Sequence, residues 1–138
     1  MSELKSILIT GCSSGIGYDA AHALHHRGWQ VFATCRKQAD CDRLTAEGLT
    51  SFVLDYENET SIDAGFDRAM TLSNGRLDVL FNNGAYAIPG AVEDLPTDAW
   101  RQTYEANFFG GQHLSRKAMA VMRAQGQGRI RQNSSVLG

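Results

Sequence analysis

The sequence predicts an α/β protein in which helices cover both faces of a doubly wound parallel sheet. Short apolar runs rich in β-formers alternate along the chain with segments of helical periodicity. Glycine or a glycine-containing turn ends most of these segments. Neither an internal repeat nor a linker interrupts the 138 residues. We therefore expect one domain, residues 1–138, that ends after a fifth strand.

Three strand–helix pairs make up the first half of the predicted fold. Residues 6–10 read SILIT, a short run that Gly11 stops. Over residues 15–27 apolar side chains recur at helical spacing, and Gly28 ends the helix. The same reasoning, with glycine or Asn-Gly at each helix end, predicts strands at 29–35 and 50–54 and helices at 38–47 and 58–73.

A fourth strand, a long helix and a fifth strand complete the predicted sheet. Residues 77–82 read LDVLFN and precede a loop, 84–95, that is rich in small residues. A helix then covers residues 96–125. A glycine turn at 126–128 leads into the last strand, 129–133. The predicted apolar face of the long helix consists of Trp100, Tyr104, Phe108, Leu114, Ala118 and Met122.

Arg131 does not fit the pattern of a central parallel strand, which is nearly continuous in apolar residues. A buried and unpaired arginine would be costly in free energy. On an edge strand, by contrast, a charge opposes aggregation. The sequence leaves open whether this strand is an edge or residue 131 has been altered.

Composition and charge exclude several classes of protein. The net charge of −2 comes without any basic run, so we expect no nucleic-acid partner. No apolar run approaches the roughly 18 residues of a membrane span, and the opening MSELKSILIT lacks the features of a secretory signal. The three cysteines are odd in number and lack metal-ligand spacing, so we expect neither a disulfide framework nor a metal site. These features together predict a cytoplasmic protein.

A glycine-rich loop, TGCSSGIG at residues 10–17, connects the first strand to the first helix. Gly11 permits the sharp turn, Gly15 lets the main chain approach a pyrophosphate, and Gly17 lets helix and strand pack closely. Free N–H groups at the helix start then bind the anion. The alternative is an ordinary glycine turn that caps a helix. The expected dinucleotide contacts in this loop are Gly11, Ser13, Ser14, Gly15, Ile16 and Gly17.

The end of the second strand predicts which dinucleotide is bound. Folds that prefer NAD place Asp or Glu about 20 residues beyond the glycines, where it binds the ribose 2′-hydroxyl. This chain has Arg36 and Lys37 in that neighbourhood, without a carboxylate beside them. A guanidinium there suits a 2′-phosphate, with charge-assisted hydrogen bonds of about 1.5–3 kcal/mol each. We therefore expect NADP rather than NAD, and the alternative is a surface Arg-Lys pair without a ligand.

With these motifs together, the chain resembles the short-chain dehydrogenase/reductase family over residues 6–138. The loop TGCSSGIG is similar to the family's T-G-x-x-x-G-x-G, and Asn82-Asn83-Gly84-Ala85 is similar to its N-N-A-G with the last two residues exchanged. Leu54-Asp55 stands where the family has an acid that contacts adenine. The resemblance thus adds Asp55, Asn82 and Gly84 to the expected cofactor contacts of a Rossmann fold.

The resemblance also implies catalytic residues. The segment NFFG that begins at Asn107 matches the family's N-x-x-G, and NSSVLG matches the strand end that carries its catalytic serine. That serine is Ser135, with Ser134 as the less favoured neighbour. In the family the serine positions the substrate oxygen, and the asparagine supports a water-linked proton path. The implied reaction is hydride transfer between nicotinamide and a small-molecule alcohol, aldehyde or ketone.

The family's proton-transferring base is a tyrosine in the pattern Tyr-x-x-x-Lys, and none of the four tyrosines here has lysine four residues later. In the family this motif lies on the helix after the serine, beyond position 138. We therefore expect residues 1–138 to be the cofactor-binding half of a longer oxidoreductase. A catalytically silent nucleotide-binding module is the alternative.

The resemblance extends to substrate class and assembly. The segments YAIPGAVEDLP, residues 86–96, and NSSVLG are most similar to the branch of the family that acts on lipophilic steroids, retinoids or long-chain aldehydes. In the family another helix packs beside the long helix and also builds the subunit contact; without that neighbour the apolar face of the long helix would be exposed and would tend to recruit a partner. We therefore expect a lipophilic substrate and a homo-oligomer.

Overall fold

A computed structural model describes residues 4–136 and has an α/β fold built on a parallel sheet. The five strands follow the order β3-β2-β1-β4-β5, which steps outward from β1 in both directions, as in a Rossmann-like doubly wound sheet. Each strand lies within the range predicted from the sequence. The strands are β1 (Ser6–Ile9), β2 (Gln30–Cys35), β3 (Thr50–Val53), β4 (Val79–Asn82) and β5 (Arg129–Gln132).

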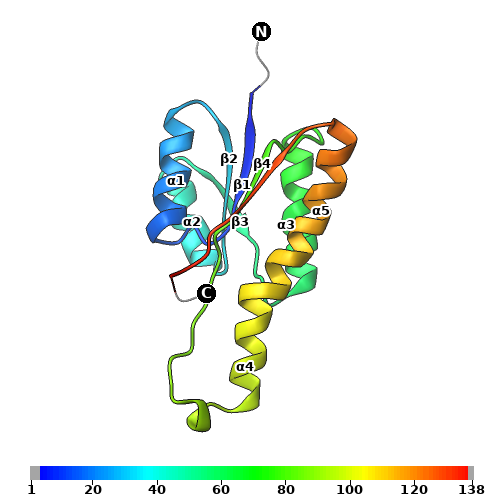
Figure 1. The fold of residues 1–138 in the computed structure, drawn as a ribbon. Helices are drawn as coiled ribbons and strands as arrows, with labels where there is room; N and C mark the ends of the chain where they lie inside the picture. The colour runs from blue at the N-terminus through cyan, green and yellow to red at the C-terminus, as the bar shows by residue number, and fades with distance from the viewer. Residues whose placement is uncertain (1–3, 137–138) are drawn as a thin grey trace.

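Helices cover both faces of the sheet. Figure 1 shows α1 and α2 on one face and α3 and α5 on the other. α3 begins after Asn58, whose side chain accepts a hydrogen bond from the Ser61 amide at 3.1 Å. α5 is followed by Gly126, whose φ of 76° only glycine adopts readily. The helices are α1 (Gly15–His26), α2 (Gln38–Ala46), α3 (Glu59–Leu72), α4 (Thr97–Tyr104) and α5 (Gly110–Gln125), with a 3-10 turn at Val92–Asp94.

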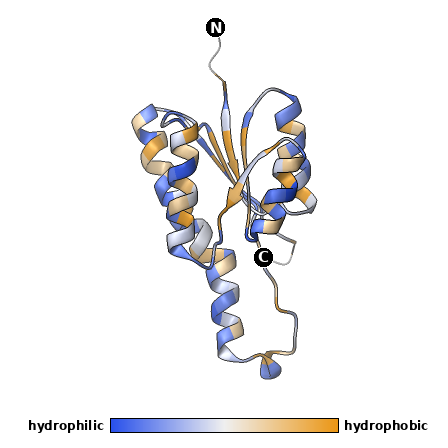
Figure 2. Ribbon diagram, turned by 180° about the vertical axis from the view of Figure 1, so that it is seen from behind, coloured by the Kyte–Doolittle hydropathy of each residue, from blue (hydrophilic) through white to orange (hydrophobic). Residues whose placement is uncertain are grey.

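The two faces of the sheet bury separate apolar clusters, because side chains alternate along each strand. On β1, Leu8 belongs to the cluster under α3 and α5, whereas Ile7 and Ile9 belong to the cluster under α1 and α2. Figure 2 shows the largely apolar strands at the centre of the molecule, between helices in which hydrophobic and hydrophilic residues alternate. Removing a buried leucine side chain typically costs about 2–5 kcal/mol. These clusters therefore hold the strand ends in register.

The predicted long helix is continuous in the chain but changes geometry in its middle, where a wide π-helical turn, Glu105–Phe109, joins α4 to α5. Only part of the predicted apolar face is buried. Leu114, Ala118 and Met122 are buried in α5, as predicted. The other half of this face is exposed: Trp100, Tyr104 and Phe108 are 40%, 58% and 57% exposed. In Figure 1, α4 extends beyond the sheet, so no strand lies against it.

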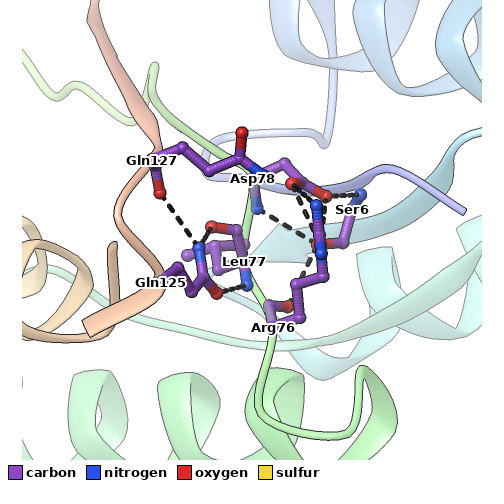
Figure 3. A network of polar contacts seen from close by, with 6 residues as sticks. All are labelled: Ser6, Arg76, Leu77, Asp78, Gln125 and Gln127. Carbon is purple, nitrogen blue, oxygen red and sulfur yellow. Dashed lines mark hydrogen bonds and ion pairs between the residues drawn. The ribbon is translucent and has the colours of Figure 1, made fainter. Parts of the chain in front are cut away.

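Asp78 links the amino-terminal ends of two strands. Its carboxylate accepts a hydrogen bond from the Ser6 amide at 2.8 Å and forms an ion pair with Arg76 at 3.0 Å (Figure 3). Burial acts to raise the pKa of Asp78, but the Arg76 and Ser6 contacts outweigh it, and the pKa lies below its ordinary value. Asp78 therefore orients the main chain where β1 and β4 begin.

Among the strands that the structure describes, β3 and β5 lie at the two edges of the sheet, and Arg131 on β5 is exposed. Among residues 4–136, no helix combines the length and the apolar character that crossing a bilayer requires.

Candidate functional site

The strand order creates a crevice at the carboxyl ends of β1 and β4, where the chain winds away in opposite directions. The loops that follow the two strands meet there, because the Asn83 amide donates a hydrogen bond to Thr10 Oγ1 at 3.0 Å. A cavity in this crevice is lined by Thr10, Gly11, Ser13, Arg36, Leu54, Asp55, Tyr56, Glu57, Gly84, Ala85, Tyr86 and Ala106.

Three glycines shape the loop at residues 10–17. Gly11 and Gly15 have φ angles of 67° and 62°, in the left-handed region that favours glycine. A Cβ atom at Gly17 would overlap the carbonyl oxygen of Gly11, so the first turn of α1 packs directly on the loop. A Cβ atom at Gly15 would meet no atom within 4 Å, so its main chain faces open space. The result is a bare main-chain cradle at a helix start, which suits an anion.

Arg36 follows β2 and lies between an acid and an aromatic ring. Its Nη1 is 3.8 Å from Glu57 Oε2, and its guanidinium carbon is 5.5 Å from the centre of the Tyr86 ring. A guanidinium has five N–H donors, so donors remain for a second anion when one carboxylate is paired with it. Lys37 is exposed at the start of α2 and does not line the cavity. Of the two predicted cations, Arg36 is therefore the one that faces the site.

A buried chain of hydrogen bonds lies beneath the cavity. The Tyr56 hydroxyl is 2.7 Å from Thr10 Oγ1 and donates to Asn82 Oδ1 at 2.5 Å. Asn82 Nδ2 in turn donates to Ser115 Oγ of α5 at 2.8 Å. Burial raises the pKa of Tyr56 well above its usual value, so the hydroxyl stays protonated and remains a donor at neutral pH. Asn82 is thus held inside this network and does not line the cavity.

Asn107 occupies the π-helical turn and binds the loop that follows β4. Its Nδ2 donates to the Tyr86 carbonyl at 2.6 Å, and its Oδ1 accepts from the Tyr86 amide at 2.9 Å. A π turn carries one more residue than an α turn, which changes the direction of the side chains within it. Asn107 therefore fixes the segment whose Tyr86 ring lies against Arg36.

Ser135 lies two residues beyond Asn133, which ties the end of β5 to the neighbouring loop. The Asn133 amide donates to the Asn82 carbonyl at 3.0 Å, and Asn133 Nδ2 donates to Asn83 Oδ1 at 2.8 Å. Ser135 itself is exposed. The structure thus brings Ser135 and Asn107 to the same edge of the sheet, on separate segments, with Asn107 directed to the main chain of Tyr86.

The predicted cofactor contacts divide into three groups, of which one, Gly17, Lys37 and Asn82, does not line the cavity. Those that line the cavity are Gly11, Ser13, Arg36, Asp55 and Gly84. Ser14, Gly15 and Ile16 form the exposed start of α1, and Ile16 is 60% exposed. Sequence reasoning missed Tyr56 and Glu57 as residues of the cavity wall. Their position could have indicated them, because residues that directly follow a parallel strand lie at its carboxyl edge.

The buried cysteines do not extend the site. Cys12, within the glycine loop, is fully buried, and its thiol donates to the Ile9 carbonyl at 3.3 Å. Burial raises the pKa of Cys12, and it raises that of Cys35 to about 12, so neither is poised as a thiolate. In the part of the chain that the structure describes, no three His, Cys, Asp or Glu side chains are arranged to hold a metal ion.

Comparisons with known proteins place this geometry in context. Residues 5–138 match the family model described as short chain dehydrogenase. The uncharacterized oxidoreductase YbbO of Escherichia coli (strain K12) is 37% identical over 134 residues, which are 97% of this chain and 50% of that protein. Retinol dehydrogenase 8 of Homo sapiens is 31% identical over 140 residues, which are 97% of this chain and 45% of that protein.

A solved structure shows the same arrangement of the chain. The crystal structure of an actinorhodin polyketide ketoreductase variant with NADPH has a TM-score of 0.88 and 26% sequence identity. The match covers 96% of this chain and 53% of that one. This chain therefore spans about half the length of the proteins that it matches.

Proposed function

The chain belongs to the short-chain dehydrogenase family, and on this premise we propose that it binds a nicotinamide dinucleotide in the cavity at the carboxyl ends of β1 and β4. The glycine loop supports the proposal. Its main chain at Gly15 faces open space, and Gly17 allows α1 to begin directly against the loop. A pyrophosphate requires such close main-chain approach and the unpaired N–H groups of a helix start. Asp55, on the cavity wall, is the proposed adenine contact, and Gly84 the proposed contact on the nicotinamide side.

NADP(H) is the preferred dinucleotide in this proposal, and Arg36 on the cavity wall is the observation that carries it. The residues that end β2 and follow it, Cys35, Arg36 and Lys37, include no carboxylate to take a ribose 2′-hydroxyl. Charge-assisted hydrogen bonds to a 2′-phosphate contribute about 1.5–3 kcal/mol each, which corresponds to a preference of roughly tenfold or more. The ketoreductase of similar structure was solved with NADPH.

The proposed reaction is hydride transfer to or from a small-molecule alcohol, aldehyde or ketone. The nicotinamide, when bound, supplies the site that accepts or donates the hydride. Ser135 is the proposed partner of the substrate oxygen, and Asn107 supports the water-linked path by which that oxygen exchanges its proton. As an alcohol carbon loses hydride, its oxygen must lose a proton to a base tuned near neutral pH. Tyr56 does not serve as this base, because burial raises its pKa and its proton is donated to Asn82.

A catalytically silent nucleotide-binding module is the second candidate, because no tyrosine of the sequence is followed by lysine four residues later. Intact mass spectrometry of the protein from its natural source separates the two candidates. A mass above 15.1 kDa, the mass of these 138 residues, would support a longer oxidoreductase. A mass equal to it would support the silent module. For the 138-residue polypeptide alone we expect no oxidation of NADPH with any aldehyde or ketone, and turnover that Ser135→Ala abolishes would contradict this.

The proposed substrate is lipophilic. Retinol dehydrogenase 8, by its name, acts on retinol, and its similarity runs over 97% of this chain. We further propose a cytoplasmic location, which the free thiols of Cys12, Cys35 and Cys41 support, because a reducing compartment keeps thiols unpaired. The proposed homo-oligomer is argued below from the exposed face of α4.

Calorimetric titration of the 138-residue chain with NADPH and NADH tests the cofactor proposal. We expect NADPH to bind at least about tenfold more tightly, and Arg36→Asp to remove most of that difference, because the carboxylate repels the 2′-phosphate. Arg27→Asp is the matched control, since Arg27 is exposed at the far end of α1. Equal dissociation constants for the two dinucleotides in the wild-type chain would refute the NADP preference.

A further inference from the structure

Tyr56 lies three residues after the end of β3, and its side chain is buried. Its side chain is 9% exposed and belongs to the apolar cluster under α3 and α5. Its hydroxyl, however, reaches back to the ends of β1 and β4, where it meets Thr10 and Asn82. Tyr56 therefore joins the carboxyl ends of three strands at the floor of the cavity that it also lines.

The donors and acceptors of these hydrogen bonds show how the Tyr56 hydroxyl affects the loop after β4. Tyr56 donates its one proton to Asn82 Oδ1. The Thr10 hydroxyl then donates to the Tyr56 oxygen at 2.7 Å, which is nearer than the Phe81 carbonyl at 3.4 Å. Because the Thr10 hydroxyl proton points to Tyr56, Thr10 Oγ1 is free to accept hydrogen bonds from the main-chain amides of Asn83 and Gly84, at 3.0 Å each. The position of the loop after β4 thus depends, through Thr10, on the hydroxyl of Tyr56.

The ring of Tyr56 restricts the same loop by contact. A Cβ atom at Gly84 would lie 2.9 Å from Tyr56 Cε2 and 3.2 Å from Cδ2, closer than carbon atoms pack. Gly84 in turn lies against the glycine loop, because a Cβ atom at Gly11 would be 2.8 Å from Gly84 Cα. The three residues form one layer with no space for an added methyl group. An alanine at position 84 would therefore push on the ring, whereas the nearest atom of the glycine loop, Thr10 Oγ1, would lie 3.4 Å from the new methyl group, an ordinary contact.

We propose that Tyr56 is a positioning residue for the dinucleotide cavity, and that it is the reason this chain has the order Gly84-Ala85 where the family pattern reads Ala-Gly. The hydroxyl orients the main chain of residues 83 and 84 through Thr10, and the ring requires glycine at 84. The proposal rests on the proposed function, because it assumes that a dinucleotide occupies this cavity. Tyr56 acts through its neighbours and takes no part in proton transfer.

Substitutions at positions 56 and 84 separate the ring from the hydroxyl. Tyr56→Phe keeps the ring, so Gly84→Ala should lower the melting temperature as much in this background as in the wild-type chain. Tyr56→Val removes the ring atoms that the new methyl group would meet. In the Tyr56→Val background, Gly84→Ala should lower the melting temperature only slightly. An equal loss of melting temperature in the Tyr56→Val background would overturn the proposed contact.

Affinity for NADPH tests the positioning role, measured by calorimetry at a temperature where circular dichroism shows each variant to be folded. Tyr56→Phe should weaken NADPH binding about fivefold, the effect of one lost hydrogen bond. Gly84→Ala should weaken it as well, and adding Tyr56→Val should restore the affinity to that of Tyr56→Val alone. The matched control is Tyr104→Phe, because Tyr104 is 58% exposed on α4.

The outcomes distinguish this proposal from the proposed function. A wild-type chain that binds neither NADPH nor NADH would remove the proposed function and with it the positioning role, whereas the melting temperatures would still decide the Tyr56–Gly84 contact. Unchanged NADPH affinity in Tyr56→Phe, with normal wild-type binding, would overturn the positioning role alone. If Tyr56→Val does not fold, the Tyr56→Phe affinity decides the question.

Discussion

The side-chain amide of Gln125, at the end of α5, binds both main-chain polar groups of Leu77. Its Oε1 accepts from the Leu77 amide at 2.8 Å, and its Nε2 donates to the Leu77 carbonyl at 2.9 Å (Figure 3). Leu77 therefore pairs with a side chain where the predicted strand would pair with a neighbouring strand, and β4 begins two residues later, at Val79. This contact attaches the end of α5 to the sheet.

Gln125→Ala should lower the free energy of unfolding by about 1–3 kcal/mol, because it leaves the amide of the fully buried Leu77 without its partner. Urea denaturation followed by circular dichroism measures the change. Gln112→Ala is the control, since Gln112 is exposed on the same helix, and it should change the free energy by no more than about 0.5 kcal/mol. Equal losses in the two variants would show that the Leu77 contact has no special role.

Asn107→Ala should weaken NADPH binding about fivefold through loss of the two bonds that hold Tyr86. Without them the Tyr86 ring is no longer fixed beside Arg36. Calorimetric titration of the folded variant checks this, with Gln102→Ala on the exposed surface of α4 as the control. The prediction fails if the variant binds NADPH as tightly as the wild-type chain.

The contact between α3 and α5 should make stability depend on pH through Asp63. Hydrogen bonds from His113 and then Lys117 hold the pKa of Asp63 below its ordinary value of 3.8. A lowered folded-state pKa means that the stabilisation is present above pH 3.8 and is lost as the pH falls through the folded-state value. Asp63→Asn should therefore lower the melting temperature at pH 7, and the difference from wild type should shrink toward pH 3.

The same melting curves on Asp67→Asn provide the control for Asp63, because Asp67 is exposed on the same helix. Asp67→Asn should leave the melting temperature at pH 7 close to that of the wild-type chain. A loss in Asp63→Asn that is as large at pH 3 as at pH 7 would contradict the assignment to the charged carboxylate.

The exposed face of α4 and the π turn predicts self-association. Trp100, Tyr104 and Phe108 recur at a spacing of four residues, which places them on one side of the helix, and each is at least 40% exposed. Large apolar side chains exposed on one side of a helix favour association with a partner. Light scattering at micromolar concentration should show a species larger than the monomer, and Phe108→Ser should reduce it more than Leu72→Ser on α3. A stable wild-type monomer with a sharp cooperative melt would argue against the prediction.

The elements of the fold could be predicted because their signals are local. Alternation of apolar runs with helical spacing determines strands such as β1 and helices such as α1, and a glycine motif is readable from eight consecutive residues. The π turn at Glu105–Phe109 was not predictable in this way. Its side chains continue the apolar spacing of a regular helix, so the wider turn is visible only in the main chain of the structure, where Asn107 also binds Tyr86, 21 residues away.

The features of the candidate site also fall into those that local sequence signals predict and those that only the structure shows. The sequence by itself determined that a glycine loop follows the first strand and that Arg36 follows the second, because each depends on a few adjacent residues and their place after a strand. Only the tertiary structure decided that Arg36 faces the cavity while Lys37 does not, and that Tyr56 joins Thr10 to Asn82. Those contacts span 26 and 46 positions of the chain, and their geometry follows from how the strands are ordered in the sheet, which no short stretch of residues specifies.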